Sequence, residues 1–207
     1  MISLAILAGG KSNRMGQDKA LLPFMGYPLI LRIVKRLETL TNDIIVTTDG
    51  VADYTGLGLP LFTDLQPGSG ALGGLYTSLY VAKNPIVAAV ACDMPFANLN
   101  LFEHERDLLI KLDVDVVIPS TPKGLEPMHA IYRRETCLPA IQSAMKAEQW
   151  KLIAWLPEVK VFYLSEKEMQ LFDPQHLAFW NLNTQEEFER AEELAIQEDD
   201  HENDDSN

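Results

Sequence analysis

The chain has 207 residues, an apolar fraction of 47% and a formal net charge of −13. This length and this apolar fraction predict one folded domain and exclude wholesale disorder. No apolar run approaches the roughly 20 residues of a membrane span, and so acidic a chain lacks the basic face that nucleic acid requires. We therefore expect neither a membrane nor a nucleic-acid partner.

The cysteine content and the N-terminal run bear on localisation. Cys92 and Cys137 are too few for a disulfide framework, and they match no metal-ligand spacing. The apolar N-terminal run has no basic stretch before it, which argues against a secretory signal. Both features predict a cytoplasmic protein.

Buried strands are predicted where apolar residues run without interruption, and helices where they recur at helical spacing. The expected strands cover residues 2–8, 43–49, 59–64, 85–93, 114–120, 128–135 and 160–165. The expected helices cover residues 28–40, 70–83, 99–112, 136–147 and 185–197. This alternation predicts an α/β fold, a three-layer Rossmann-like domain whose mixed, mainly parallel sheet is flanked by helices. We expect one domain over 1–197 and a disordered acidic tail over 198–207.

Two glycine-rich segments follow expected strands. The first, LAILAGGKSNRMGQDKALL at 4–22, contains Gly-Lys-Ser, but a P-loop would need a glycine where Ala5 stands. Its glycines still let backbone N–H groups approach phosphate oxygens, while Arg14 and Lys19 supply cations. The second, PGSGALGG at 67–74, precedes an expected helix and either enters the same site or is only a flexible loop.

The charge is unevenly distributed along the chain. Residues 1–37 carry six Lys and Arg against one Asp, a local charge of +5. Residues 198–207 carry six acids and no Lys or Arg, which is typical of a solvated end. Positive charge gathered beside a glycine-rich turn in an acidic chain predicts a site for a small polyanion.

Ligands of parallel α/β sheets lie at the carboxyl ends of the strands. That rule selects the first glycine-rich segment together with Thr47 to Asp49, Asp64 and Asp93. Asp93 could cap the next helix, but Pro95 weakens that reading, and a carboxylate at a strand end is well placed to hold Mg²⁺ against a phosphate. Asp64 could equally start the turn at 67–68.

Polar residues later in the chain allow two readings. His129 is more simply a packed strand histidine than a ligand or a base. Asn181 and Asn183 have a two-residue period, which places both side chains on one face of a strand. Thr184 could instead cap the last helix, with Glu187 completing a capping box, and both readings can hold together.

With L-A-G-G-x-S-x-R-M-G-x-D-K-A at 7–20, the sequence resembles nucleotidyltransferases of the nucleotide-diphospho-sugar transferase type, and among them most the molybdenum cofactor guanylyltransferases. The resemblance continues through PGSGALGG, ACDMP at 91–95, HAIYRRE at 129–135 and WNLNT at 180–184. It implies transfer of GMP from GTP to the terminal phosphate of molybdopterin, with Mg²⁺ as cofactor, giving molybdopterin guanine dinucleotide and pyrophosphate. The protein partners that it implies are molybdenum-cofactor insertion proteins or acceptor enzymes.

The resemblance also implies roles for single residues. The nucleotide-binding set comprises Leu7, Ala8, Gly9, Gly10, Lys19, Thr47, Asp64 and Asp93. The catalytic set comprises Lys19, Arg14 and Asp93, with Asp93 as the metal ligand, and the acceptor side has Asn181 and Asn183. Two departures are a threonine at 47, where the family often has asparagine, and G-A-L-G-G at 70–74, where it often has G-P-L-A-G.

Three alternatives stay open at the level of the sequence. A cytidylyl- or sugar-nucleotide transferase would use the same fold. A P-loop NTPase would also have an apolar strand that ends in a magnesium-binding aspartate, as 85–93 does, although Ala5 argues against it. A non-catalytic nucleotide-binding adaptor would bind GTP without releasing pyrophosphate.

Overall fold

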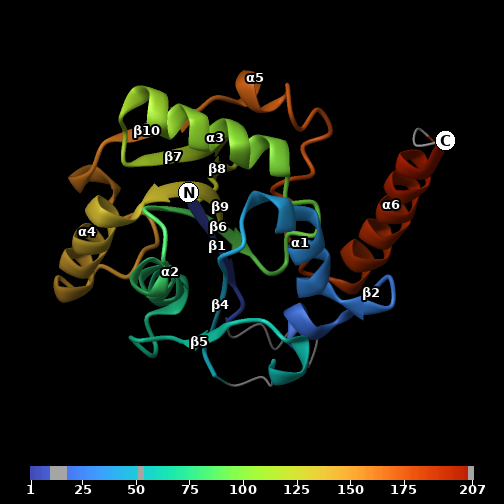
Figure 1. Cartoon of the computed structure of the whole chain (residues 1–207), viewed down its shortest axis with the longest axis horizontal. Coiled ribbons are helices and arrows are strands. Elements are labelled where there is room, and N and C mark those ends of the chain that lie inside the picture. The colour runs from blue at the N-terminus through green and yellow to red at the C-terminus, as the bar shows by residue number, and fades with distance from the viewer. Residues whose placement is uncertain (10–17, 51–53, 205–207) are drawn as a thin grey trace.

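A twisted sheet runs through the centre of the molecule (Figure 1). The computed structural model describes residues 1–9, 18–50 and 54–204, with side chains as far as residue 198. The strands of the sheet are, in spatial order, β10 (Val161–Leu164), β7 (Val116–Thr121), β9 (His129–Arg133), β6 (Ile86–Ala91), β1 (Ile2–Leu7), β4 (Ile44–Thr48) and β5 (Leu61–Thr63). Strand β9 is antiparallel to β6 and β7, and the other pairs along this path are parallel. The predicted mixed, mainly parallel sheet is therefore confirmed.

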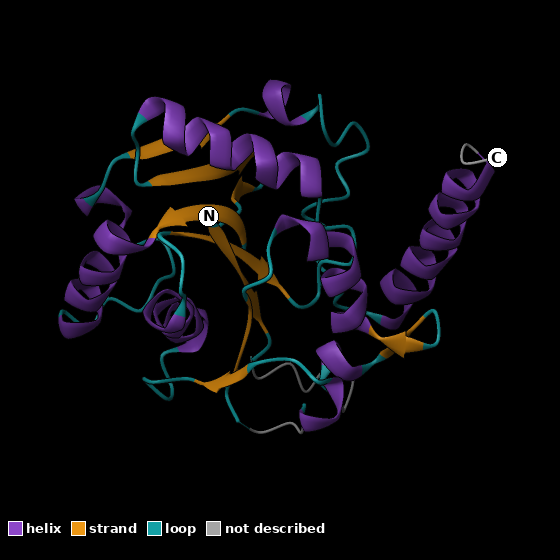
Figure 2. Ribbon diagram, in the orientation of Figure 1, coloured by secondary structure: helices purple, strands orange, loops and turns teal. Residues whose placement is uncertain are grey.

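Helices cover both faces of the sheet, as the colours of Figure 2 show. Because successive side chains of a strand point to opposite faces, β1 contributes to two hydrophobic clusters. Leu4 and Ile6 pack with α1 (Leu29–Leu37) and α3 (Leu99–Leu112), whereas Ala5 and Leu7 pack with α2 (Gly70–Val81) and α4 (Arg134–Lys146). The all-apolar sequence of β1 follows from this coverage.

Helix α6 (Gln185–Asp204) lies beside a small hairpin formed by β2 (Pro23–Phe24) and β3 (Tyr27–Pro28) (Figure 1). Their shared cluster contains Phe24, Leu29, Phe96, Leu182, Phe188, Ala191 and Ala195. Glu198 of α6 also pairs with Arg32 and Arg36 of α1, at 3.2 and 2.9 Å. The helix continues to Asp204 and so differs from the disordered tail expected from residue 198, while the domain boundary at 197 stays a prediction.

The predicted helix over 99–112 matches α3, because its end signals are local. The Asn98 side chain accepts a hydrogen bond from the Leu101 N–H, and Asp113 ends the helix in the left-handed conformation. The sequence reading missed short pieces: β2, β3, β8 (Gly124–Leu125), α5 (Glu166–Met169) and several 3₁₀ turns. It also expected a strand around Asn181 and Asn183, where the chain has no regular secondary structure. None of the helices in the described ranges is long and apolar enough to cross a membrane.

Candidate active site

Strands β1, β4 and β5 bring predicted nucleotide-binding residues together at their carboxyl ends. Leu7 is paired with Thr47 of β4, and Thr48 of that strand is paired with Thr63, next to Asp64. A small cavity of 20 Å³ between these strands and α2 is lined by Leu7, Ala8, Gly9, Thr47, Thr48, Asp64, Gly70, Ala71, Gly74 and Met128. The second glycine-rich segment thus enters the same site as the first strand end, as one of its two readings predicts.

Gly9 lies at a close approach between two backbone segments. A Cβ placed on Gly9 would be 3.0 Å from the backbone nitrogen of Asp49 and 3.6 Å from the carbonyl carbon of Thr48. The neighbouring Ala8 N–H donates to the Thr47 carbonyl at 2.8 Å. A side chain at position 9 would therefore push the ends of β1 and β4 apart.

Lys19 links two parts of the predicted site that are far apart in sequence. Its ammonium donates to Asp93 Oδ2 at 3.1 Å and to Asn183 Oδ1 at 2.8 Å, and the residue is only 8% exposed. An ammonium has three N–H donors, so one is left after these two contacts with described residues. Asp93 follows β6 without capping the next helix, since Asn98 does so.

The segment that contains both asparagines is held against Asp93 by the backbone. The Leu182 N–H donates to the Asp93 carbonyl at 3.0 Å, which brings Asn183 within reach of Lys19. This isolated hydrogen bond replaces the strand pairing expected there. The alternative reading of Thr184 is confirmed: Thr184 Oγ1 accepts from the Glu187 N–H, and a Glu187 carboxylate oxygen accepts from the Thr184 N–H.

Two residues of the predicted site, Gly10 and Arg14, lie outside the described residues. Thr47 lies within them, but its side chain is 2% exposed, and its hydroxyl oxygen is 3.5 Å from the Ser78 hydroxyl oxygen of α2. Thr47 therefore forms part of the wall between strand and helix.

Asp64 is the titratable group of the cavity. One of its oxygens, Oδ1, is buried without a hydrogen-bond partner among the described residues. Burial, and to a smaller extent the negative charge of Asp49, raise the pKa of Asp64 to about 6. The carboxyl can therefore accept a hydrogen bond from a ligand and changes charge close to neutral pH.

Neither of two reactive side chains near the site is activated as a nucleophile or a base. Burial, followed by the charge of Asp93, raises the pKa of the Cys92 thiol well above its ordinary value. His129 is fully buried, stacks on Phe102 with ring centroids 3.8 Å apart, and accepts the Asn98 N–H at Nε2. Burial lowers the pKa of His129 to about 3, so its imidazole is neutral near pH 7, and burial raises the pKa of the neighbouring Glu105. The interpretation of His129 as a packed strand histidine is confirmed.

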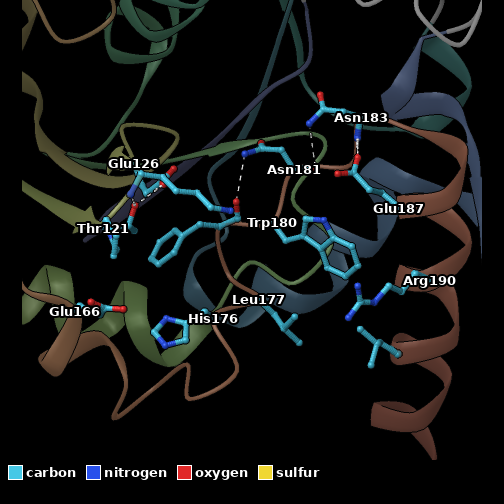
Figure 3. Close-up of a pocket in the computed structure, with 14 residues that line it drawn as sticks. Thr121, Glu126, Glu166, His176, Leu177, Trp180, Asn181, Asn183, Glu187 and Arg190 are labelled. Carbon is cyan, nitrogen blue, oxygen red and sulfur yellow. Dashed lines mark hydrogen bonds between the residues drawn. The ribbon is translucent and has the colours of Figure 1, made fainter.

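A larger pocket of 620 Å³ opens beside the two asparagines (Figure 3). Asn181 and Asn183 line one side, next to Trp180 and Arg190, and Thr121 and Glu126 lie across from them. Thr121 Oγ1 donates to Glu126 Oε1 at 3.2 Å, and burial raises the pKa of Glu126. The sequence reading missed this opposite wall, because TPKGLE shows only the turn signal of the β7–β8 hairpin.

The site suits a magnesium ion that arrives with a substrate. Across the described ranges, no group of three or more His, Cys, Asp or Glu side chains could hold a metal. Asp93 presents a carboxylate just after β6, and the oxygen that Lys19 leaves free, Oδ1, has no hydrogen bond from a described residue. Because Mg²⁺ is commonly bound by one or two carboxylates together with substrate phosphates, this donor set fits it.

Comparison with known proteins identifies the family. The family model described as "MobA-like NTP transferase domain" matches residues 4–159. The chain belongs to the MobA-like NTP transferase family. A probable molybdenum cofactor guanylyltransferase of Peptoclostridium acidaminophilum is 31% identical over 95% of this chain and 90% of its own. A molybdenum cofactor guanylyltransferase of Desulfosudis oleivorans is 33% identical over 90% and 92%. This MobA-like protein is thus a nucleotidyltransferase, and the resemblance seen in its motifs is confirmed.

Solved structures show that the MobA-like fold extends over nearly the whole chain. Molybdopterin-guanine dinucleotide biosynthesis protein A from Archaeoglobus fulgidus covers 95% of this chain, with a TM-score of 0.82 and 24% identity, and all of that chain is covered. A 2-C-methyl-D-erythritol 4-phosphate cytidylyltransferase from Thermus thermophilus covers 93%, with a TM-score of 0.64 and 15% identity, and 98% of that chain is covered. The fold alone therefore does not select the nucleotide.

Proposed function

We propose that the protein transfers GMP from GTP to the terminal phosphate of molybdopterin, forming molybdopterin guanine dinucleotide and pyrophosphate. The names of the curated relatives support this substrate pair. The observation that carries the proposal is the position of Lys19, whose ammonium contacts Asp93 at the strand edge and Asn183 in the wall of the 620 Å³ pocket. A cation in that position can contact the donor nucleotide on one side and the acceptor molecule on the other.

The donor nucleotide is assigned to the strand edge. The backbone of Leu7, Ala8 and Gly9 lines the base and ribose, and Gly9 lets the backbone come close to the ligand. Asp64 offers the unpartnered oxygen Oδ1 as a hydrogen-bond acceptor for the nucleotide. Gly10 and Arg14, which the sequence also predicts in this role, belong to the same assignment.

The acceptor is assigned to the larger pocket. Its volume of 620 Å³ lies in the range of about 300–1,000 Å³ that is usual for small-molecule sites. Asn181 and Asn183 line it, and the contact of Asn183 with Lys19 marks the side on which the acceptor phosphate is assigned. We propose that the acceptor is molybdopterin with or without bound molybdenum. We also propose that cytoplasmic proteins pass on or receive the product.

The reaction requires no protein nucleophile. An oxygen of the acceptor phosphate bonds to the α-phosphorus of GTP, and the bond from that phosphorus to the β-phosphate oxygen breaks, so pyrophosphate leaves. A phosphate monoester has a second pKa of about 6, so the attacking oxygen is deprotonated near neutral pH. This chemistry agrees with the raised pKa of Cys92 and with the uncharged, packed His129.

The protein's task is to hold two anions together and to neutralise their charge. Lys19 has an N–H left for a phosphate oxygen beyond its contacts with Asp93 and Asn183. Asp93 would hold Mg²⁺, which supplies Lewis-acid stabilisation of the phosphates when it is bound. Asp93 also orients the lysine through its other oxygen.

Replacing Lys19 or Asp93 by alanine tests these roles. We expect each variant to lose about a hundred- to a thousandfold in turnover, as is typical when one preorganised electrostatic contact is removed. The matched control is Lys35→Ala, which removes a lysine that is exposed on α1. Steady-state pyrophosphate release measures the effect, with circular dichroism as the check on folding. Near-normal turnover in Lys19→Ala or Asp93→Ala would contradict the role of that residue.

A further inference from the structure

A hydrogen-bonded chain leads from the first turn of α6 to the lysine of the site. We propose that Glu187 is a positioning residue for Lys19, which it holds in place through Asn183. Glu187 fixes the backbone at Asn183, and the Asn183 side chain in turn fixes the lysine ammonium. The proposal rests on the role proposed above for Lys19, and it explains what orients the lysine side chain.

The first link joins Glu187 to the backbone (Figure 3). Its Oε2 accepts the N–H of Asn183 at 2.6 Å and the N–H of Thr184 at 3.0 Å. The Thr184 hydroxyl oxygen accepts the Glu187 N–H at 3.1 Å in return. One carboxylate oxygen accepts two consecutive N–H groups, and hydrogen bonds to a carboxylate are stronger than those between neutral groups. The turn at 183–184 therefore has little freedom to move.

The second link joins Asn183 to the lysine. Its Oδ1 accepts from the Lys19 ammonium at 2.8 Å, and its Nδ2 donates to the Asn181 carbonyl at 3.1 Å. Both ends of the Asn183 amide are therefore used inside the protein. We infer that Asn183 acts on the lysine, whereas Asn181, whose Nδ2 donates to the Phe179 carbonyl at 3.2 Å, has its Oδ1 left for the acceptor.

Helix α6 does not depend on Glu187 for its place in the fold. Phe188, Ala191 and Ala195 bury one side of the helix in the cluster that contains Phe24. Glu192 also accepts the Met25 N–H at 2.6 Å. A variant at position 187 should consequently keep the helix docked while loosening the turn that precedes it.

The decisive experiment compares Glu187→Ala with Glu186→Ala, a neighbouring exposed acid in the same first turn. For each protein, the affinity for GTP is measured with Mg²⁺ and without acceptor, and kcat and the KM for molybdopterin are measured by pyrophosphate release. Glu187→Gln serves as the rescue, because its amide oxygen can still accept both N–H groups.

We expect Glu187→Ala to lower kcat by about ten- to a hundredfold, because a small displacement of a catalytic group can cost up to about a hundredfold. Its affinity for GTP should weaken, its KM for molybdopterin should stay close to the wild-type value, and Glu187→Gln should recover most of kcat. Glu186→Ala should behave like the wild type. In an Asn183→Ala background, Glu187→Ala should have little further effect, because both residues act through one contact.

Three results would overturn the proposal. A rise in the KM for molybdopterin alone would make Glu187 an acceptor contact. Equal kinetics of Glu186→Ala and Glu187→Ala would show that Glu187 has no positioning role. If Glu187→Ala lowered kcat by the same factor in the Asn183→Ala background as in the wild type, Glu187 would not act through Asn183. Failure of the proposed function is recognised separately, since Lys19→Ala would then keep its turnover, whatever Glu187→Ala does.

Discussion

The position of Asp64 in the fold changes the properties of its carboxyl group. Asp64 directly follows β5, and its buried Oδ1 lacks a hydrogen-bond partner among the described residues. Burial first, and Asp49 second, raise its pKa from 3.8 to about 6. In the folded protein this carboxyl is therefore easier to protonate than an ordinary aspartate, and a bound hydrogen-bond donor would stabilise its charged form.

This pKa shift predicts a pH-dependent stability. Because the folded pKa lies above the unfolded value of 3.8, the contribution of Asp64 to stability is complete below 3.8 and is lost as the pH rises through about 6. Asp64→Asn stays neutral, so its free energy of unfolding should rise relative to that of the wild type across this window. Urea unfolding at several pH values measures the difference.

Asp49→Asn is the companion variant, since it removes the second cause of the shift. We expect it to lower the pKa of Asp64 and to move the window toward lower pH. A difference between Asp64→Asn and the wild type that is the same at every pH, or that shrinks as the pH rises, would show that Asp64 is not destabilised in its charged form.

The sequence could predict which residues lie at the edge of the sheet but not their contacts. The positions of Asp64 and Asp93 could be predicted because the ends of parallel strands meet at one edge of a sheet. The contact of Lys19 with Asn183 could not, because 164 residues separate them and no strand pairing joins them. It depends on one backbone hydrogen bond, from Leu182 to Asp93, which leaves no periodic pattern in the sequence.

At the scale of secondary-structure elements, the start of α2 is packed around its glycines. A Cβ on Gly73 would lie 2.9 Å from Ser69 Cβ, 3.1 Å from the Gln66 carbonyl oxygen and 3.7 Å from Asp64 Oδ2. The helix can therefore approach the 64–69 loop only because this position has no side chain. The glycines of the second glycine-rich segment thus permit close packing, and the segment also lines the 20 Å³ cavity at the strand ends.

Gly73→Ala should consequently destabilise the protein. Overpacking costs typically about 1–3 kcal/mol, and it outweighs the gain in helix propensity of about 1 kcal/mol. The affinity for GTP should fall too, because the clash pushes on the loop that carries Asp64. Gly56→Ala is the control, because nothing lies within 4 Å of the added methyl group. Urea unfolding and GTP titration measure both variants. A Gly73→Ala protein as stable as Gly56→Ala would refute this packing.

Element boundaries could be predicted where the signals are local. Asn98 and Asp113 mark the ends of α3 in the sequence itself, so the expected range and the observed one agree. The alternation at Asn181 and Asn183 suggested a strand, but no strand in the described part of the chain pairs with this segment. Alternation gives the direction of side chains without supplying a hydrogen-bonding partner.

At the scale of the whole molecule, the C-terminal helix α6 pairs with α1, which lies early in the sequence. Glu198 of α6 pairs with Arg32 and Arg36, two of the six cations that give residues 1–37 their charge of +5. That charge is therefore not all available to a polyanion, and among the described cations of this region Lys19 is the one that contacts the predicted site. The family model stops at 159, whereas Asn183 and α6 come from beyond it. Residues beyond the match to the family model thus supply a contact to Lys19, through Asn183.

The most direct test of the central claim is the release of pyrophosphate from GTP, CTP, ATP and UTP, each with Mg²⁺, in the presence and absence of molybdopterin. We expect rapid release from GTP when molybdopterin is present, and none without the acceptor. Equal or faster release from CTP would assign the protein to another nucleotide. Binding of GTP without any release in the presence of molybdopterin, or release from GTP alone, would contradict the transfer of GMP to that acceptor.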